Sequence, residues 1–146
     1  IGSTCVYQGE ELACADVQDI PIDLMQDPWG IEFAPAFLGR DTCRTPMVWT
    51  DGPNGGFSDA NQTWLPVANA HKARPGLSEM KRDWSVYNDF AEFLNWRKSQ
   101  AAFMTANEMS DLSGSDTEII FDRVSPTQTL RCVFDFENLT ATFKEV

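Results

Sequence analysis

The side chains most often used for metal or thiol chemistry are few and widely separated in this sequence. Four cysteines lie at positions 5, 14, 43 and 132 without C-x-x-C spacing, and the single histidine is His71. A structural zinc site needs paired ligands, so we predict no metal site in the chain. Unpaired cysteines are typical of small buried thiols in a reducing compartment, which predicts a cytoplasmic protein. His71 has polar neighbours, and we expect it to be a solvated loop residue.

Carboxylates and arginines are the other candidates for chemistry. Glu10 and Glu11 are adjacent, and neighbouring side chains on an extended backbone point to opposite sides. They therefore cannot flank one substrate bond, and we expect them to form hydrogen bonds that tie a strand end to its loop. Asp41 lies beside Arg40, and we expect its carboxylate to orient that arginine. Four residues on, Arg44 is expected to anchor the loop through backbone carbonyls.

Most of the N-terminal half lacks the periodicity of regular secondary structure. Residues 4–7 form a short apolar run followed by the polar stretch Q-G-E-E, which predicts a buried strand ending in a turn. Residues 13–80 are interrupted repeatedly by proline and glycine and are predicted to be mainly loop. A loop this long usually builds a functional surface on a scaffold supplied elsewhere. We therefore predict that the chain is a fragment of a larger fold.

The C-terminal half has the pattern of one helix followed by short strands. A helix is predicted over residues 85–99, with Asp83 or Ser85 as its N-cap. Its apolar stripe consists of Val86, Phe90, Phe93 and Leu94. Strands are predicted over residues 103–109, 118–124, 129–136 and 140–146. The alternation of Leu130, Cys132, Phe134 and Phe136 with polar neighbours indicates an antiparallel sheet.

The charge of the chain excludes two classes of partner. Its 22 acidic and 11 basic residues give a formal net charge of −11. Such a surface repels phosphate groups, so nucleic acid and anionic membrane are not expected partners. No apolar stretch approaches the roughly 18 residues that a membrane-spanning helix requires.

Several ordered motifs resemble the α-glucosidases and oligo-1,6-glucosidases of glycoside hydrolase family 13, the α-amylase superfamily. The strongest is GRDTCRTPMVW at residues 39–49, which is similar to the G-R-D-x-x-R-T-P-M-x-W segment of that family. The others follow the family's order: YQGEEL at 7–12, DPWGI at 27–31, FAP at 33–35, NGGF at 54–57 and TWLPV at 63–67.

The resemblance implies an α+β fragment of a two-domain enzyme. Residues 1–101 would hold the last strand, the long loop and the last helix of a (β/α)₈ barrel. Residues 102–146 would begin an antiparallel β C-terminal domain that is incomplete here. Active sites of such barrels lie at the C-terminal ends of the strands, so the long loop would belong to the active-site rim.

The resemblance also implies which functional residues the chain holds. In this family the catalytic carboxylates follow the fourth, fifth and seventh strands, so no catalytic residue is predicted within the chain. Arg40 matches the family's arginine that helps bind the terminal glucose, and it is our one predicted substrate-binding residue. Four aromatic residues could stack on sugars but are expected to fill small local cores instead: Trp29, Trp49, Phe57 and Trp64. No cofactor is predicted, and any calcium ion of the parent enzyme would have its ligands outside this chain.

We thus predict the C-terminal part of a retaining α-glucosidase that releases terminal α-linked glucose from oligosaccharides and is inactive in isolation. The expected partner is an α-linked oligosaccharide, with linkage preference and oligomeric state left open. The alternative is a non-catalytic carbohydrate-binding or accessory β module. A gene encoding seven preceding strands with an Asp/Glu/Asp set would distinguish the enzyme from the module.

Overall fold

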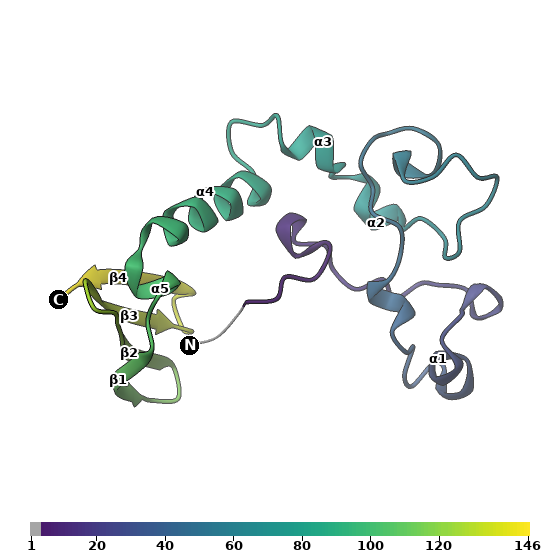
Figure 1. The fold of residues 1–146 in the computed structure, drawn as a ribbon. Helices are drawn as coiled ribbons and strands as arrows, with labels where there is room; N and C mark the ends of the chain where they lie inside the picture. Colours follow the sequence, from purple (N-terminus) through teal and green to yellow (C-terminus); the bar gives the residue numbers. More distant parts are fainter. Residues whose placement is uncertain (1–3) are drawn as a thin grey trace. The chain divides into compact units, whose positions relative to one another are not determined.

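The structure, a computed structural model, describes residues 4–146. The chain divides into two compact units (Figure 1). One unit is Val6–Ala91, and the other is Glu92–Val146 together with Thr4 and Cys5.

The unit Val6–Ala91 is built from loops and short helical turns. These are the 3₁₀ turns Glu10–Leu12 (η1), Ile22–Leu24 (η2), Asp41–Cys43 (η3) and Pro53–Gly56 (η4), and the α-helices Pro28–Phe33 (α1), Asn69–Lys72 (α2) and Gly76–Glu79 (α3). A small apolar cluster holds the loops together, formed by Val17, Ile20, Met25 and Ala68 with Leu38 packed against it. The unit therefore has a local core but little regular structure, as the many prolines and glycines predict.

The strand predicted at residues 4–7 is wrong for this structure. These residues carry no regular secondary structure, and their side chains are exposed. A strand requires the hydrogen bonds of a neighbouring strand, and no segment within residues 4–146 pairs with this one. The apolar sequence of residues 4–7 suits a strand, but a neighbouring strand that could pair with it is absent from residues 4–146.

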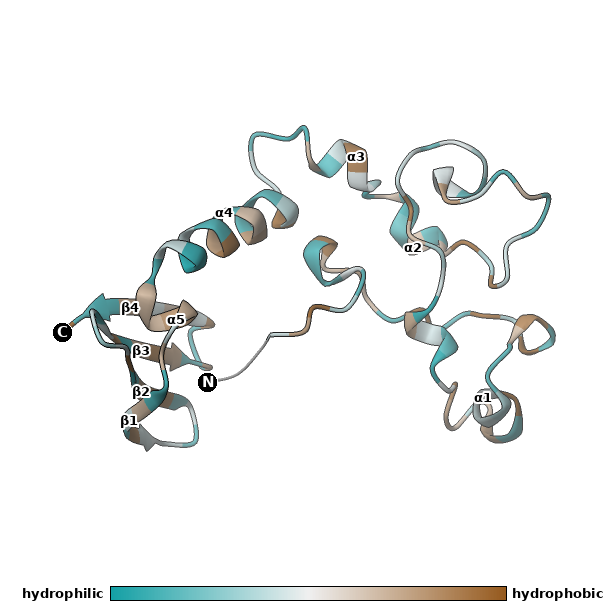
Figure 2. Ribbon diagram, in the orientation of Figure 1, coloured by the Kyte–Doolittle hydropathy of each residue, from teal (hydrophilic) through white to brown (hydrophobic). Residues whose placement is uncertain are grey.

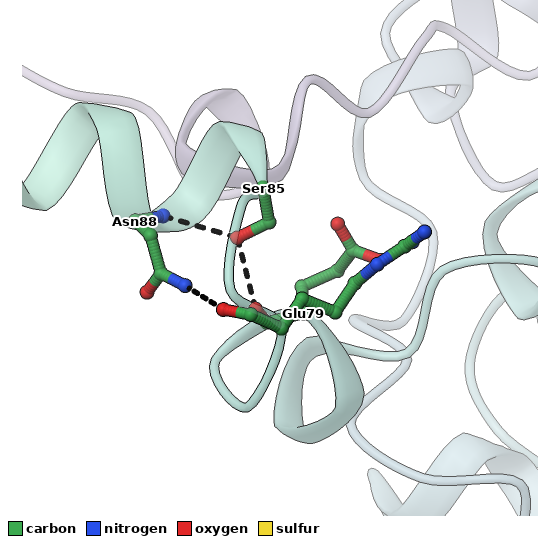
Figure 3. A network of polar contacts seen from close by, with 4 residues as sticks. Glu79, Ser85 and Asn88 are labelled. Carbon is green, nitrogen blue, oxygen red and sulfur yellow. Dashed lines mark hydrogen bonds and ion pairs between the residues drawn. The ribbon is translucent and has the colours of Figure 1, made fainter.

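The long helix α4 (Val86–Ser99) matches the predicted helix over residues 85–99, and a serine hydroxyl accepts a hydrogen bond from its first turn. Of the two candidate caps, Ser85 is the one used: its hydroxyl accepts a hydrogen bond from the Asn88 backbone N–H at 3.2 Å and donates to the Glu79 carbonyl at 2.9 Å (Figure 3). Asn88 in turn donates its side-chain amide to the Arg82 carbonyl at 2.7 Å. This network ends the preceding loop and starts the helix.

The apolar stripe of α4 is only partly covered. No residue of the helix is buried; Val86, Phe90 and Leu94 are half-buried, and Phe93 is exposed. In the part of the chain that the structure describes, no helix combines the length and the apolar character needed to cross a membrane.

The C-terminal strands form one antiparallel sheet in the order β1-β2-β3-β4. Its strands are Glu108–Gly114 (β1), Glu118–Val124 (β2), Thr129–Asp135 (β3) and Thr140–Glu145 (β4). The last three coincide closely with the predicted strands. Figure 2 shows β3 as mainly hydrophobic and β4 as mainly hydrophilic. The predicted alternation in β3 is confirmed for its first half: Leu130 and Cys132 are buried, while Arg131 on the other face pairs with Asp122 of β2 at 2.8 Å. Phe134 is half-buried, and Phe136 lies beyond the strand and is exposed.

The strand predicted over residues 103–109 is wrong for residues 103–107. Ala101–Met104 forms a short helix, α5, and the strand begins only at Glu108. Alanine favours helix over strand, and the turn is closed by a hydrogen bond from the Thr105 N–H to the Ala101 carbonyl at 2.8 Å. The Gln128 side chain accepts the otherwise free Ala102 N–H at 3.0 Å, which fixes α5 near the sheet.

An aromatic cluster centred on Phe143 of β4 forms the packing of this unit. Its ring centroid lies 5.0 Å from Trp96, 5.6 Å from Phe103, and 5.9 Å from both Phe93 and Phe134. These are favourable tilted and edge-to-face distances for aromatic pairs. One ring thus joins α4, α5 and two strands.

Replacing this central ring should destabilise the sheet selectively. We expect Phe143→Ala to cost about 3 kcal/mol through lost aromatic contacts and the resulting cavity, and to lower the Tm of the intact protein measured by circular dichroism. The matched control is Leu139→Ala, because Leu139 is 87% exposed and should change the Tm little. Equal effects of the two substitutions would show that the cluster does not support the sheet.

Candidate functional site

The buried carboxylate of Asp41 holds two separate loop segments together. Asp41 is fully buried in η3, and its Oδ2 accepts the backbone N–H groups of Gln26 at 2.6 Å and Asp27 at 2.8 Å. Its second oxygen, Oδ1, is buried without a hydrogen-bond partner among the described residues. Two backbone donors on one buried carboxylate oxygen fix the segment that leads into α1.

Asp27 makes the reciprocal connection. Its Oδ2 accepts the Arg40 backbone N–H at 2.7 Å, while its Oδ1 accepts the Trp29 N–H at 3.0 Å and so caps α1. Pro28 occupies the first position of the helix, where its missing N–H costs nothing. We call the paired side chains of Asp27 and Asp41 the aspartate clasp.

The hydrogen bonds from Arg40 and Trp29 lower the pKa of Asp27 below its ordinary value, and the nearby positive charges of Arg44 and Arg40 act in the same direction. Hydrogen bonds to the charged form of a carboxylate favour that form. Asp27 is therefore an anion at neutral pH, with its acceptors directed at backbone donors.

Two glycines let the clasped segments approach closely. Gly39 has a φ of 68°, and a Cβ there would lie 2.8 Å from both Asp27 Oδ2 and the Gly30 nitrogen. At Gly30 a Cβ would lie 2.5 Å from the Leu38 carbonyl oxygen. Side chains at either position would separate the segments, which explains the glycines in the DPWGI and GRD stretches.

A cavity of about 480 Å³ lies beside the clasp and is lined by Asp27, Trp29, Phe37, Arg40 and Arg44. Such a volume is within the range of small-molecule sites. Two guanidinium groups, a carboxylate and two aromatic rings therefore share one concave surface. Arg44 also lines a smaller neighbouring cavity with Phe57 and Trp64.

The structure changes two predictions about charged residues near Arg40. Asp41 does not orient the Arg40 side chain, because its carboxylate binds backbone N–H groups of the preceding segment. Arg44 forms no hydrogen bond to a carbonyl within residues 4–146 and instead shares the cavity with Arg40. The guanidinium of Arg40 has no ion-pair partner in that same part of the chain, where the ion pairs involve Arg82 and Arg131.

Glu10 and Glu11 form local hydrogen bonds as predicted, although the segment before them is not a strand. Their carboxylates accept the N–H groups of Tyr7 at 3.1 Å and Gly9 at 2.9 Å, within their own turn. His71 is more engaged than predicted: it is half-buried and its Nε2 lies 2.8 Å from the Ala15 carbonyl oxygen, which ties α2 to a distant loop.

The predicted role of the loop aromatics holds for one residue. Trp49 is half-buried and packs on Gly76, where a Cβ would lie 2.9 Å from the indole. Trp29, Phe57 and Trp64 are exposed, so the prediction that they fill local cores is wrong.

The cysteines are free, but they are not uniformly buried. Cys132 is buried and Cys14 half-buried, and burial raises the pKa of both thiols. Cys5 and Cys43 are exposed. No three side chains of His, Cys, Asp or Glu within the described residues come together in a way that could hold a metal ion.

Of the residues that line the cavity, sequence reasoning singled out Arg40 as a binding residue but did not expect Asp27, Phe37 or Arg44 beside it. One signal was available, because an aspartate followed by proline is a typical start of a helix. No comparable signal in the sequence brings Phe37 to the same surface.

The clasp generates a prediction about pH. Because the folded-state pKa of Asp27 lies below its ordinary value of about 3.9, this carboxylate stabilises the fold above about pH 4, and the stabilisation is lost as the pH falls through the lower folded-state value. Asp27→Asn keeps a helix-capping side chain but removes the charge. We expect its Tm to be below that of the wild type at pH 7, with the difference closing below about pH 4. A difference that stays constant across this range would contradict the proposed role of the charge.

Comparison with known proteins places this geometry in a family. Residues 1–106 match the sequence profile described as "Alpha amylase, catalytic domain". The chain is 38% identical over 141 residues to a probable alpha-glucosidase of Rhizobium meliloti, covering 97% of this chain and 25% of that protein. It is 35% identical to the salivary alpha-glucosidase of Anopheles gambiae, over 66% of this chain and 17% of that protein.

Solved structures of other proteins have the same fold over most of this chain. The crystal structure of the alpha-glucosyl transfer enzyme XgtA superposes with a TM-score of 0.83 at 36% identity, over 92% of this chain and 25% of that one. The trehalulose synthase MutB from Pseudomonas mesoacidophila shares the fold, with a TM-score of 0.75 at 20% identity, over 92% of this chain and 27% of that one. The chain spans 17–27% of the length of these relatives. It belongs to the α-amylase family, glycoside hydrolase family 13, and holds the last part of that family's (β/α)₈ barrel with part of its antiparallel C-terminal domain.

Proposed function

We propose that this chain is the C-terminal part of a retaining α-glucosidase, and that Arg40 binds the terminal glucose of an α-linked oligosaccharide. The observation that carries the proposal is the cavity in which Arg40 and Arg44 lie beside exposed aromatic rings. A guanidinium group offers several N–H donors in a fixed plane, which suits the closely spaced hydroxyl groups of a sugar. Relatives named alpha-glucosidase and oligo-1,6-glucosidase support the same substrate class.

The backbone geometry of the site supports a binding role for Arg40. Its N–H is held by the aspartate clasp, while its side chain is exposed at the cavity. The fixed backbone positions the Arg40 Cα at the cavity, and its guanidinium forms no ion pair or hydrogen bond within residues 4–146 that a ligand would have to displace. Binding still removes rotamer freedom from this exposed side chain.

Catalysis requires groups that this cavity lacks. A retaining glycosidase uses two carboxyl groups about 5–5.5 Å apart, one as nucleophile and one as acid and base. Among the described residues lining the cavity, Asp27 is the one carboxylate, and its acceptors are occupied by the N–H groups of Trp29 and Arg40. Its lowered pKa also makes it a poor proton donor at neutral pH. We therefore assign the chemistry to carboxylates elsewhere in the parent enzyme.

The same first step serves hydrolysis and glucosyl transfer. A covalent glucosyl-enzyme is released by water in the first case and by a sugar hydroxyl in the second. The likeness to an alpha-glucosyl transfer enzyme at 36% identity makes transfer products worth measuring alongside glucose. Either outcome leaves the proposed role of Arg40 unchanged.

The first test concerns Arg40 in the intact enzyme. Arg40→Ala should lower kcat/KM for maltose or isomaltose by about 10- to 100-fold, which corresponds to one or two charge-assisted hydrogen bonds, while the Tm changes little. Arg40→Lys should recover only part of the loss, because an ammonium lacks the planar fork. Lys98→Ala, an exposed cation on α4, serves as the control. Normal kinetics combined with a large drop in Tm would assign Arg40 a structural role instead.

The second test concerns the isolated chain. Residues 1–146 alone should release no p-nitrophenol from p-nitrophenyl α-glucoside, since the proposed catalytic carboxylates lie elsewhere in the parent. Turnover that follows the purified polypeptide through successive columns would refute this assignment. The intact enzyme, assayed in parallel, provides the positive control.

A further inference from the structure

Asn54 begins the only Asn-Gly pair of the sequence, and asparagine is chemically least durable in such pairs. In spontaneous deamidation the backbone nitrogen of the following residue attacks the side-chain carbonyl carbon. Glycine hinders this attack less than any other residue, because it has no side chain and the greatest backbone freedom. Deamidation is therefore expected first at Asn54, unless the fold prevents it.

The side chain of Asn54 is engaged in the native turn. Its carboxamide nitrogen donates to the Ser58 carbonyl at 3.1 Å and to the Ala60 carbonyl at 2.7 Å. A carbonyl oxygen only accepts hydrogen bonds, so the amino end of the carboxamide has to face these two groups. The side chain thus closes the turn over residues 54–60, and cyclisation onto Gly55 would break both bonds.

The attacking nitrogen is engaged as well. The Gly55 N–H donates to the Gly52 carbonyl at 3.0 Å. The Gly55 carbonyl accepts the N–H groups of Trp49 at 2.7 Å and Thr50 at 2.9 Å. The backbone on both sides of Gly55 is therefore fixed. All of these contacts lie within residues 49–60, so they do not depend on what else covers this segment in the parent enzyme.

We propose that Asn54 is a deamidation site that the native turn protects, and that opening of residues 54–60 makes it subject to irreversible modification. In the open turn the Gly55 nitrogen bonds to the Asn54 Cγ, and the bond from Cγ to Nδ2 breaks. The amino group leaves as ammonia, taking up the amide proton of Gly55. Water then opens the cyclic imide at either carbonyl and leaves aspartate or isoaspartate. One water is consumed and one ammonia released, so no oxidant or other co-reactant is needed.

The modified residue cannot rebuild the turn. Aspartate at this position directs carboxylate oxygens at the carbonyls of Ser58 and Ala60, so that acceptors face acceptors. Isoaspartate adds one atom to the main chain and displaces the hydrogen bonds of Gly55. The loop therefore stays open after the reaction. This inference concerns the lifetime of the fold and does not rest on the proposed sugar-binding role of Arg40.

The experiment follows deamidation in the intact enzyme by tandem mass spectrometry. The wild type and a synthetic peptide of residues 51–62 are incubated in parallel in mildly alkaline buffer, at a temperature well below the Tm. We expect conversion at Asn54 to be at least about tenfold slower in the enzyme than in the peptide, because two side-chain hydrogen bonds must open first. Asn61 belongs to the same segment but is followed by Gln62, and it should remain unmodified as the internal control.

Gly56→Ala tests whether the turn itself protects Asn54. This substitution keeps the Asn-Gly pair, but a Cβ at Gly56 would lie 2.5 Å from the Thr50 Oγ1 on a backbone with a φ of 69°. The turn should therefore open, and Asn54 should deamidate at close to the peptide rate. Asn54→Asp, which reproduces one product, should lower the Tm, whereas the matched control Asn61→Asp should change it little.

Two results would overturn the proposal. Deamidation of the folded wild type at the peptide rate would show that the turn gives no protection, and this comparison stands even if neither Gly56→Ala nor Asn54→Asp folds. A folded Gly56→Ala as resistant as the wild type, or an Asn54→Asp with an unchanged Tm, would show that the contacts of Asn54 do not control the reaction or close the turn.

Discussion

The reciprocal hydrogen bonding of Asp27 and Asp41 is the constraint on which the candidate site depends. Neither carboxylate contacts a guanidinium directly, and each instead accepts backbone N–H groups of the other's segment. This region has few helices and no sheet among the described residues. The bonds to the two carboxylates therefore take the place of the backbone hydrogen bonds that would fix the main chain in a helix or a sheet. The functional side chains then extend from a positioned main chain, so their geometry depends on a few buried acceptors and on two glycines that admit close contact.

The loops that follow barrel strands form the active-site rim, and a rim loop must present side chains outward while keeping its own backbone satisfied. The small cluster around Val17 and Met25 supplies the local core, and the clasp supplies order at the cavity. The unit Glu92–Val146 is ordered by different interactions, namely a regular sheet and the aromatic rings that surround Phe143. Its order comes from side-chain packing, whereas that of the rim loop comes from backbone hydrogen bonds.

The sequence predicted the regular elements better than the contacts of the loops. The helix at residues 85–99 and the last three strands follow from periodicity and turn residues, which are local properties. The strand at residues 4–7 failed because pairing depends on a partner segment. Asp41 was misassigned because adjacency to Arg40 says nothing about where a buried side chain points. Three of the aromatic residues were misassigned for a related reason: the sequence does not show which rings are exposed, and only the fold separates the exposed Trp29 from the packed Trp49.

The central claim is that the cavity beside the aspartate clasp binds an α-linked glucosyl unit through Arg40. The most direct test is a crystal structure of the intact enzyme, with its catalytic carboxylates inactivated, soaked with maltose or isomaltose. The account predicts a glucosyl hydroxyl within about 3 Å of the Arg40 guanidinium, with Asp27 still bonded to the Arg40 backbone N–H. A sugar ordered in the active site without any contact to Arg40, which then pairs with a protein carboxylate instead, would contradict it.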